Sequence, residues 1–214
     1  MKGTLAMTRT DDSTASLDTR GPAAFDELLA REPGSVQISF NQPNFVPGLF
    51  QVEAYATEMI GRIRSLPPGD QELVERVTTR MRRAAGFAER LHGEAPPRVS
   101  VVIDEGVLRR VVGGPETMRA QLAHLSELSE LPTVDLGIIP LAYGAHPGLI
   151  GSFEIHRDAH GDAASYFEEA HEDEILTNDE STADRYRRIV ESMMASAVSG
   201  ADARALLEKI SNEL

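Results

Sequence analysis

The spacing of apolar residues changes along the chain, and this change most constrains the fold. Residues 36–41, VQISFN, place Val36, Ile38 and Phe40 at every second position, the pattern of a half-buried strand. From Val52 onward, apolar residues instead recur at intervals of three and four, as on one face of an amphipathic helix. The chain therefore combines strands and helices, and both need a shared core.

The same spacing rules predict the remaining elements. Pro115 and Glu116 mark the first turn of a helix, where a missing N–H and a negative charge are both tolerated. Apolar runs bounded by glycine and proline mark buried strands. Helices are predicted at 22–32, from 52 up to LPPGD, at 71–92, 106–112 and 113–128, and twice near the C-terminus; strands are predicted at 36–41, 98–104, 133–141, 151–158 and 163–169.

This order contains no regular alternation of strand and helix. It predicts an α+β fold with a mixed or antiparallel sheet of about five strands, packed with amphipathic helices. Residues 1–20 are rich in Thr, Ser and Asp, and they bury too little apolar surface to offset the cost of ordering. We expect a disordered tail over 1–20 and a single domain over 21–214.

Several functional classes are excluded by residues that the chain lacks. It has no cysteine, which excludes disulfides, thiolate metal sites and a cysteine nucleophile. No histidine pair has the HExxH spacing of a zinc site, and His156 and His160 are interpreted as solvated residues flanking a hairpin turn. We expect no metal and no cofactor. Without a signal-peptide h-region or an apolar run of about 18 residues, we expect a cytoplasmic protein and no membrane contact.

The net charge of −13 argues against direct nucleic acid binding, because a phosphate backbone is bound mainly by lysine and arginine. Arg76, Arg80, Arg83 and Arg90 nevertheless fall near one line of a predicted helix. This basic ridge could bind an anionic ligand or an acidic partner. Charge balance favours the alternative, which is pairing with carboxylates of the same chain. The acidic segment 168–184 is interpreted as a solvated loop in preference to a cation site.

Several blocks in sequence resemble a known family. NFVPGLFQVEAYA, VVIDEGVLRRVVGGPETMRAQLAHL, VDLGIIPLAYGAHPGLIGSF and SYFEE are similar, in this order, to a domain of unknown function. That domain follows the helix-turn-helix in actinobacterial XRE-type transcriptional regulators, including antitoxin-like ones. The resemblance runs from about residue 35 to the C-terminus. The family block PGLLQTxxYA is present as PGLFQVEAYA, with Phe50 and Val52 replacing a leucine and a threonine.

The resemblance implies a sensing or partner-binding role, and it carries no established catalytic residues. Family members have a helix-turn-helix of roughly sixty to eighty residues, whereas about 34 residues precede the resemblance here, so we expect no DNA-binding module. GAHPGLIGSF is similar to a family loop between two strands. Gly144, Gly148 and Gly151 are then turn positions that need positive φ or close backbone approach. His146 lies in this loop as a hinge residue or, less favoured, a catalytic base.

Two hypotheses follow. The first is a regulatory domain that binds a small molecule or a small protein partner and lacks its own DNA-binding module; a homodimer is left open. The second is an enzyme of specialised metabolism, a cyclase, isomerase or lyase, that has repurposed the sensor pocket. Polar residues near predicted strand ends and helix starts supply the candidate site. The ligand-binding candidates are Gln51, Tyr55, Arg109 and Gln121, and the acid–base candidates are Glu105, His146 and Glu168.

Overall fold

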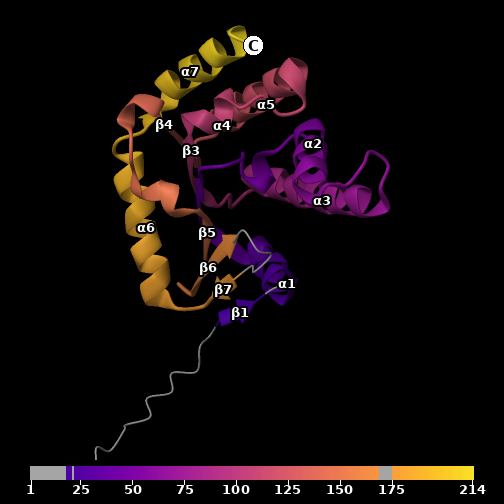
Figure 1. Ribbon diagram of the computed structural model, residues 1–214. Helices are drawn as coiled ribbons and strands as arrows, with labels where there is room; N and C mark the ends of the chain where they lie inside the picture. The colour runs from indigo at the N-terminus through magenta and orange to yellow at the C-terminus, as the bar shows by residue number, and fades with distance from the viewer. Residues whose placement is uncertain (1–17, 21, 169–174) are drawn as a thin grey trace, which may run out of the picture.

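A computed structural model describes residues 18–20, 22–168 and 175–214 (Figure 1). Within these residues the strands form one sheet, in the order β1-β7-β6-β5-β2-β3-β4-β8. Their bounds are β1 Asp18–Arg20, β2 Ser35–Gln42, β3 Arg98–Asp104, β4 Val134–Ile139, β5 Ser152–Asp158, β6 Ala163–Glu168, β7 Ile175–Thr177 and β8 Val198–Ser199. The helices are α1 Pro22–Arg31, α2 Glu53–Arg64, α3 Gln71–Leu91, α4 Glu105–Arg109, α5 Gly114–Leu128, α6 Glu180–Met194 and α7 Gly200–Asn212.

The sheet is mixed, which confirms the predicted fold class. Strands β2, β3 and β4 are parallel and are joined by crossovers through α2–α3 and α4–α5. All other pairings are antiparallel, including β5 against β2 and β8 against β4. The five predicted strands are all present. Three short ones, β1, β7 and β8, enlarge the sheet at its two edges.

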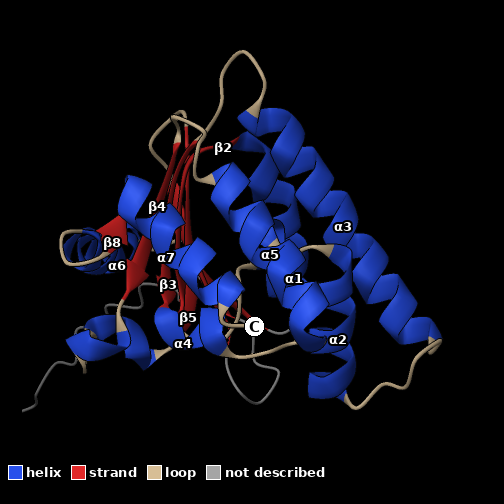
Figure 2. Cartoon of the chain, turned by 90° about the horizontal axis from the view of Figure 1, so that it is seen from above, coloured by secondary structure: helices blue, strands red, loops and turns tan. Residues whose placement is uncertain are grey.

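Helices cover both faces of the sheet. Figure 2 shows the sheet edge-on, with α1, α2, α3 and α5 on one side and α6 on the other. The first face carries the larger apolar core, in which side chains of β2, β3 and β4 pack against α2, α3, α5 and α7. The second face packs Val102, Ile139, Phe153 and Ile155 against α6. A smaller cluster joins α1 to β6.

Strand β2 shows how the alternation predicted from sequence is interrupted. Ile38 and Phe40 are fully buried, as the alternation predicts, but Val36 is 47% exposed. The pairing register with β5 shifts between Ser35 and Gln37, so a bulge turns Val36 away from the core. The bulge lies where β2 begins.

The predicted N-terminal tail falls outside the described residues, except for Asp18–Arg20, which form β1 and pair with β7. Among the helices of the described residues, none is both long enough and apolar enough to cross a lipid bilayer.

Phe40 tests the assignment of the larger core. Its ring is fully buried and packs edge-on against Phe50, with the two centroids 5.7 Å apart. We expect Phe40→Ala to lower the free energy of unfolding by about 3–5 kcal/mol, because it leaves a cavity in a packed core. Val36→Ala, in the same strand, should change it by less than about 0.5 kcal/mol. Urea unfolding followed by circular dichroism measures both, and equal effects would contradict this core.

Candidate functional site

Three of the predicted ligand-binding residues hold a backbone turn. Gln51 donates to the carbonyl of Val46 at 2.6 Å, and the Tyr55 hydroxyl accepts from the N–H of Val46 at 3.4 Å. Gln121 donates to the carbonyl of Phe50 at 2.7 Å and accepts from the N–H of Val52 at 2.9 Å. All three side chains are buried, and burial raises the pKa of Tyr55. They fix the turn over residues 46–52 against α2 and α5.

Arg109 and Glu105 form a second group, around α4. Arg109 contacts Glu105 and Glu213, each at 2.6 Å, and so ties α4 to α7. Glu105 also accepts from the N–H of Leu141 at 2.9 Å. Burial raises the pKa of Glu105, but the Leu141 N–H and Arg109 outweigh burial, so the pKa lies below its ordinary value. Glu105 is therefore ionised, and it holds the segment that follows β4 through the N–H of Leu141.

His146 lies in the same segment, which connects β4 to β5. Its Nε2 is 3.2 Å from Oδ2 of Asp104, at the end of β3. Its side chain is only 2% exposed, and its Nδ1 has no hydrogen-bond partner among the described residues. Asn41, at the end of β2, donates to two carbonyls of the same segment, those of Gly148 and Gly151, at 2.8 and 2.7 Å.

The glycines of this segment behave as the sequence predicts. Gly144 and Gly151 have φ of 81° and 146°, a region that favours glycine. Gly148 is a position of close approach, since a Cβ there would lie 2.5 Å from Oδ1 of Asn41 and 2.6 Å from Sδ of Met193. We refer to residues 141–151 as the strap. It is held to the ends of β2 and β3 by Asn41, Asp104 and Glu105.

The predicted site residues are therefore not gathered in one place. Glu105 and His146 both hold the strap, whereas Gln51, Tyr55 and Gln121 lie in the helical layer with α2 and α5. Glu168 ends β6 opposite Ser152, and its side chain lies outside the described part of the structure, as do residues 169–174. No group of three or more metal-ligating side chains is found among the described residues.

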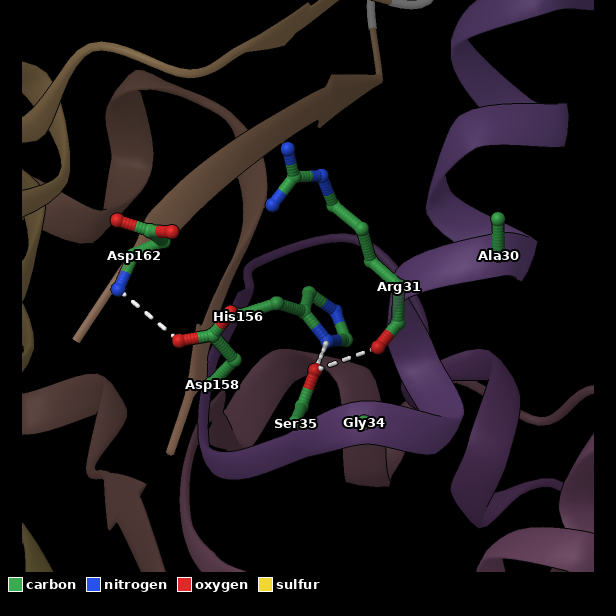
Figure 3. A pocket seen from close by; sticks show the side chains of 7 residues that line it. All are labelled: Ala30, Arg31, Gly34, Ser35, His156, Asp158 and Asp162. Carbon is green, nitrogen blue, oxygen red and sulfur yellow. Dashed lines mark hydrogen bonds between the residues drawn. The ribbon is translucent and has the colours of Figure 1, made fainter. Parts of the chain in front are cut away.

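A different site lies between α1 and the β5–β6 turn. A cavity of about 250 Å³ opens there, and Figure 3 shows its walls. The lining residues are Ala30, Arg31, Gly34, Ser35, His156, Asp158 and Asp162. Another cavity, of about 350 Å³, lies at the β4–β8 edge, but its carboxylates, Glu130 and Asp135, are exposed surface groups. Buried polar groups reach the wall of the first cavity, which we call the α1 cavity.

A line of hydrogen-bonded side chains leads from the α1 cavity into the protein. Ser35 Oγ lies 3.1 Å from Nδ1 of His156, and Nε2 of His156 lies 3.1 Å from Oε2 of Glu154. All three residues are buried. Burial raises the pKa of Glu154, but His156, Arg83 and Arg80 together lower it below its ordinary value, so the carboxyl is ionised.

This line has the order of a serine–histidine–carboxylate triad, but not the geometry of an activated nucleophile. Ser35 Oγ also lies 3.1 Å from the backbone carbonyl of Arg31, which competes with His156 for its single proton. Ser35 is also only 2% exposed, which keeps Oγ away from a substrate carbonyl. The line therefore positions His156 at the cavity wall and does not activate Ser35.

The line of side chains joins β2 to β5, and arginines of α3 connect it to that helix as well. Arg83 forms a buried ion pair with Glu32 at 2.6 Å. Although burial lowers the pKa of Arg83, Glu32 raises it above the ordinary value. Arg90 donates to the carbonyls of Glu32, at 2.6 Å, and of Ser35. The buried network thus joins α1, β2, α3 and β5.

The basic ridge predicted on α3 is accordingly engaged by groups of the same chain, at the surface for Arg76 and in a buried contact for Arg83. Pairing with carboxylates of the same chain is confirmed for Arg76, with Glu72 at 2.7 Å, and for Arg83. Arg80 donates to the Gln51 side chain at 2.9 Å. Arg90 donates to the backbone carbonyls already described.

The interpretation of His156 as a solvated turn residue is wrong. His156 lies within β5 and is 3% exposed, because β5 is paired on both sides and covered on both faces. The sequence SFEIHRD carried a signal, since Phe153 and Ile155 alternate with Glu154 and His156. In a central strand the polar set of such an alternation is also buried, and it must then be hydrogen-bonded.

Comparison with known proteins identifies a family. A family model described as a domain of unknown function (DUF5753) matches residues 25–209. No curated protein and no solved structure matches the chain.

Glu154 makes the stability of the network depend on pH. Because its folded pKa is depressed below 4.5, its carboxylate stabilises the fold above about pH 4.5, and this contribution is lost as pH falls through the folded pKa. We expect Glu154→Gln to lower Tm near pH 7, and the Tm difference from wild type to shrink on acidification. Scanning calorimetry across pH measures this. Glu130→Gln, an exposed control, should show no such trend, and a pH-independent difference for Glu154→Gln would contradict the assignment.

Proposed function

The chain belongs to the family of domains of unknown function DUF5753, and from its geometry we propose that it is a noncatalytic regulatory domain that binds a small polar molecule in the α1 cavity. The observation that carries this proposal is the buried polar network that ends at the cavity wall. Buried polar groups must be paired to offset the cost of removing them from water, so a network of this kind holds its members in fixed positions. The described contacts pair its members closely.

The network supports a regulatory role because it connects several elements. Ser35 and His156 line the α1 cavity, and Ser35 is tied to α3 through Arg90. A ligand that contacts the cavity wall therefore acts on groups shared by α1, β2, α3 and β5. A differential contact of this kind is what a ligand needs in order to shift a conformational equilibrium.

Catalysis is the alternative, as an enzyme of specialised metabolism that uses Glu105, His146 and Glu168. The geometry supports it less well. Glu105 is engaged by Arg109 and by the Leu141 N–H, and the His146 side chain is 2% exposed against Asp104. A substrate would have to displace the strap to reach either group.

The sequence resemblance to domains of actinobacterial XRE-type regulators supports placing this binding function in transcription regulation. In this proposal the domain acts in the cytoplasm, and it affects transcription through contact with another protein. The net charge of −13 is consistent with contact to protein in preference to nucleic acid.

A screen for thermal stabilisation tests the proposal. We expect a subset of small polar compounds to raise Tm, since a ligand at 100 times its Kd stabilises the folded state by about 2.7 kcal/mol. Asp162→Asn, at the exposed rim of the α1 cavity, should reduce the shift, whereas Glu130→Gln, at the β4–β8 edge, should preserve it. Turnover of a bound compound by the purified protein, lost in Glu105→Gln or His146→Ala, would establish the enzyme instead.

A second candidate function is partner docking on the strap. Its apolar side chains face solvent: Leu141, Tyr143, Leu149 and Ile150 are 57%, 50%, 53% and 63% exposed. Asn41, Asp104 and Glu105 hold the strap by its polar groups and leave these side chains outside the core. Clustered exposed apolar residues mark interaction surfaces, while single ones are ordinary.

Substitutions on the strap test docking, including a homodimer. We expect the double variant Leu149→Ser and Ile150→Ser to weaken self-association or partner capture while Tm stays near the wild-type value, because these side chains contribute little to the core. Sedimentation velocity over a concentration series measures self-association. The matched control is Ile63→Ser with Val74→Ser, which are exposed elsewhere. Equal behaviour of both double variants would exclude the strap as the interface.

A further inference from the structure

We propose that the ligand of the α1 cavity is a small zwitterion, a molecule of free amino acid size that carries both an ammonium group and a carboxylate. This inference rests on the proposed function, because it names the ligand class of the same cavity. The arrangement of charged side chains around the cavity carries it.

Opposite charges face the α1 cavity from two sides. Figure 3 shows Arg31, from the end of α1, across from Asp158 and Asp162 of the β5–β6 turn, with His156 and Ser35 beside them. No contact within 4.0 Å pairs Arg31 with either aspartate in the described structure. The cavity thus separates one cation from two anions.

The charged groups retain unused hydrogen-bonding capacity among the described residues. Arg31 contacts Glu27 through Nε at 3.5 Å, which leaves its two terminal amino groups without a described partner. Asp158 uses Oδ1 to accept from the N–H groups of His160 and Asp162, at 2.8 and 3.0 Å, which leaves Oδ2. The carboxylate of Asp162 has no described partner either.

Asp158 is ionised at neutral pH. Burial raises the pKa of Asp158, but the backbone N–H donors of His160 and Asp162 together outweigh burial, so its pKa lies below the ordinary value. By contrast, the ring nitrogens of His156 are already engaged by Ser35 and Glu154. Recognition in the α1 cavity therefore falls to Arg31 and the two aspartates.

A zwitterion matches this arrangement better than a singly charged ligand. The two free guanidinium amino groups can bind a carboxylate in a bidentate manner, and an ammonium group can donate up to three hydrogen bonds to carboxylate oxygens. A simple anion would approach Asp158 and Asp162 unfavourably, and a simple cation would approach Arg31 unfavourably. The volume of about 250 Å³ lies just below the usual range for drug-sized ligands, which suits a smaller molecule.

Isothermal titration calorimetry on the full chain tests the ligand class. The probes are free α-amino acids, their carboxamides, which lack the negative charge, and their N-acetyl forms, which lack the positive charge. We expect at least one free amino acid to bind, and each blocked form of it to bind about 10-fold or more weakly. This factor is typical for the loss of a hydrogen bond to a charged group.

Two variants assign the two charges to their partners. Arg31→Gln should bind the free amino acid and its carboxamide with similar affinity, because the partner of the carboxylate is gone. Asp162→Asn should retain the preference over the carboxamide but lose much of the preference over the N-acetyl form. Arg119→Gln and Glu130→Gln, exposed and remote from the α1 cavity, are the matched controls. Circular dichroism and Tm confirm that each variant is folded.

The outcomes separate the ligand class from the proposed function. Binding of a singly charged compound that Asp162→Asn or Arg31→Gln abolishes, with no binding of free amino acids, would overturn the zwitterion and leave the proposed function standing. Binding of amino acids with preferences unchanged in both variants would place the ligand elsewhere and overturn the inference. Absence of any ligand sensitive to cavity substitutions, in calorimetry and in the thermal screen, would overturn both.

Discussion

The buried ion pair between Arg83 and Glu32 is the contact on which the arrangement of the first face depends. It joins the middle of α3 to the turn that follows α1, with both side chains about nine-tenths buried. Removing one partner of such a pair costs about 3–5 kcal/mol, since it leaves an uncompensated charge in the core. Arg90, two turns further along α3, donates to the backbone carbonyls of Glu32 and of Ser35, the first residue of β2. Together the two arginines place Ser35 against His156, and they thereby define one wall of the α1 cavity.

This arrangement separates two sets of polar groups with different roles. The inner set, Glu154, His156 and Ser35, is buried and engaged, so it gives the site its shape. The outer set, Arg31, Asp158 and Asp162, carries the charges that a ligand can reach. A catalytic acid or base would instead need access to the substrate proton.

The sequence predicted the parts of the fold whose pattern is long, and missed those that depend on distant neighbours. Five strands were predicted from their apolar runs, whereas β1, β7 and β8 have only two or three residues and carry no readable period. The strap glycines were predicted because the family resemblance places GAHPGLIGSF in a loop between two strands, where glycines serve as turn positions. The site was not. Gln51, Tyr55 and Gln121 are polar residues that the fold uses to satisfy its own backbone, and sequence alone does not distinguish this use from ligand binding. His156 was misplaced because its burial depends on β2 and β6 pairing on either side of β5.

The α1 cavity and the strap lie at opposite ends of the same two strands. On β2, Ser35 lies at the cavity and Asn41 holds the strap; on β5, His156 lies at the cavity, while Ser152 follows the strap directly. Six residues of extended strand separate Ser35 from Asn41, a distance of about 20 Å. Substitutions that far apart, with no shared partner, are expected to have additive effects on stability. If binding at the cavity and docking at the strap are nevertheless found to influence each other, the paired strands β2 and β5 connect the two places. Non-additive effects of Asp162→Asn and the strap variants on the free energy of unfolding would then measure the coupling free energy.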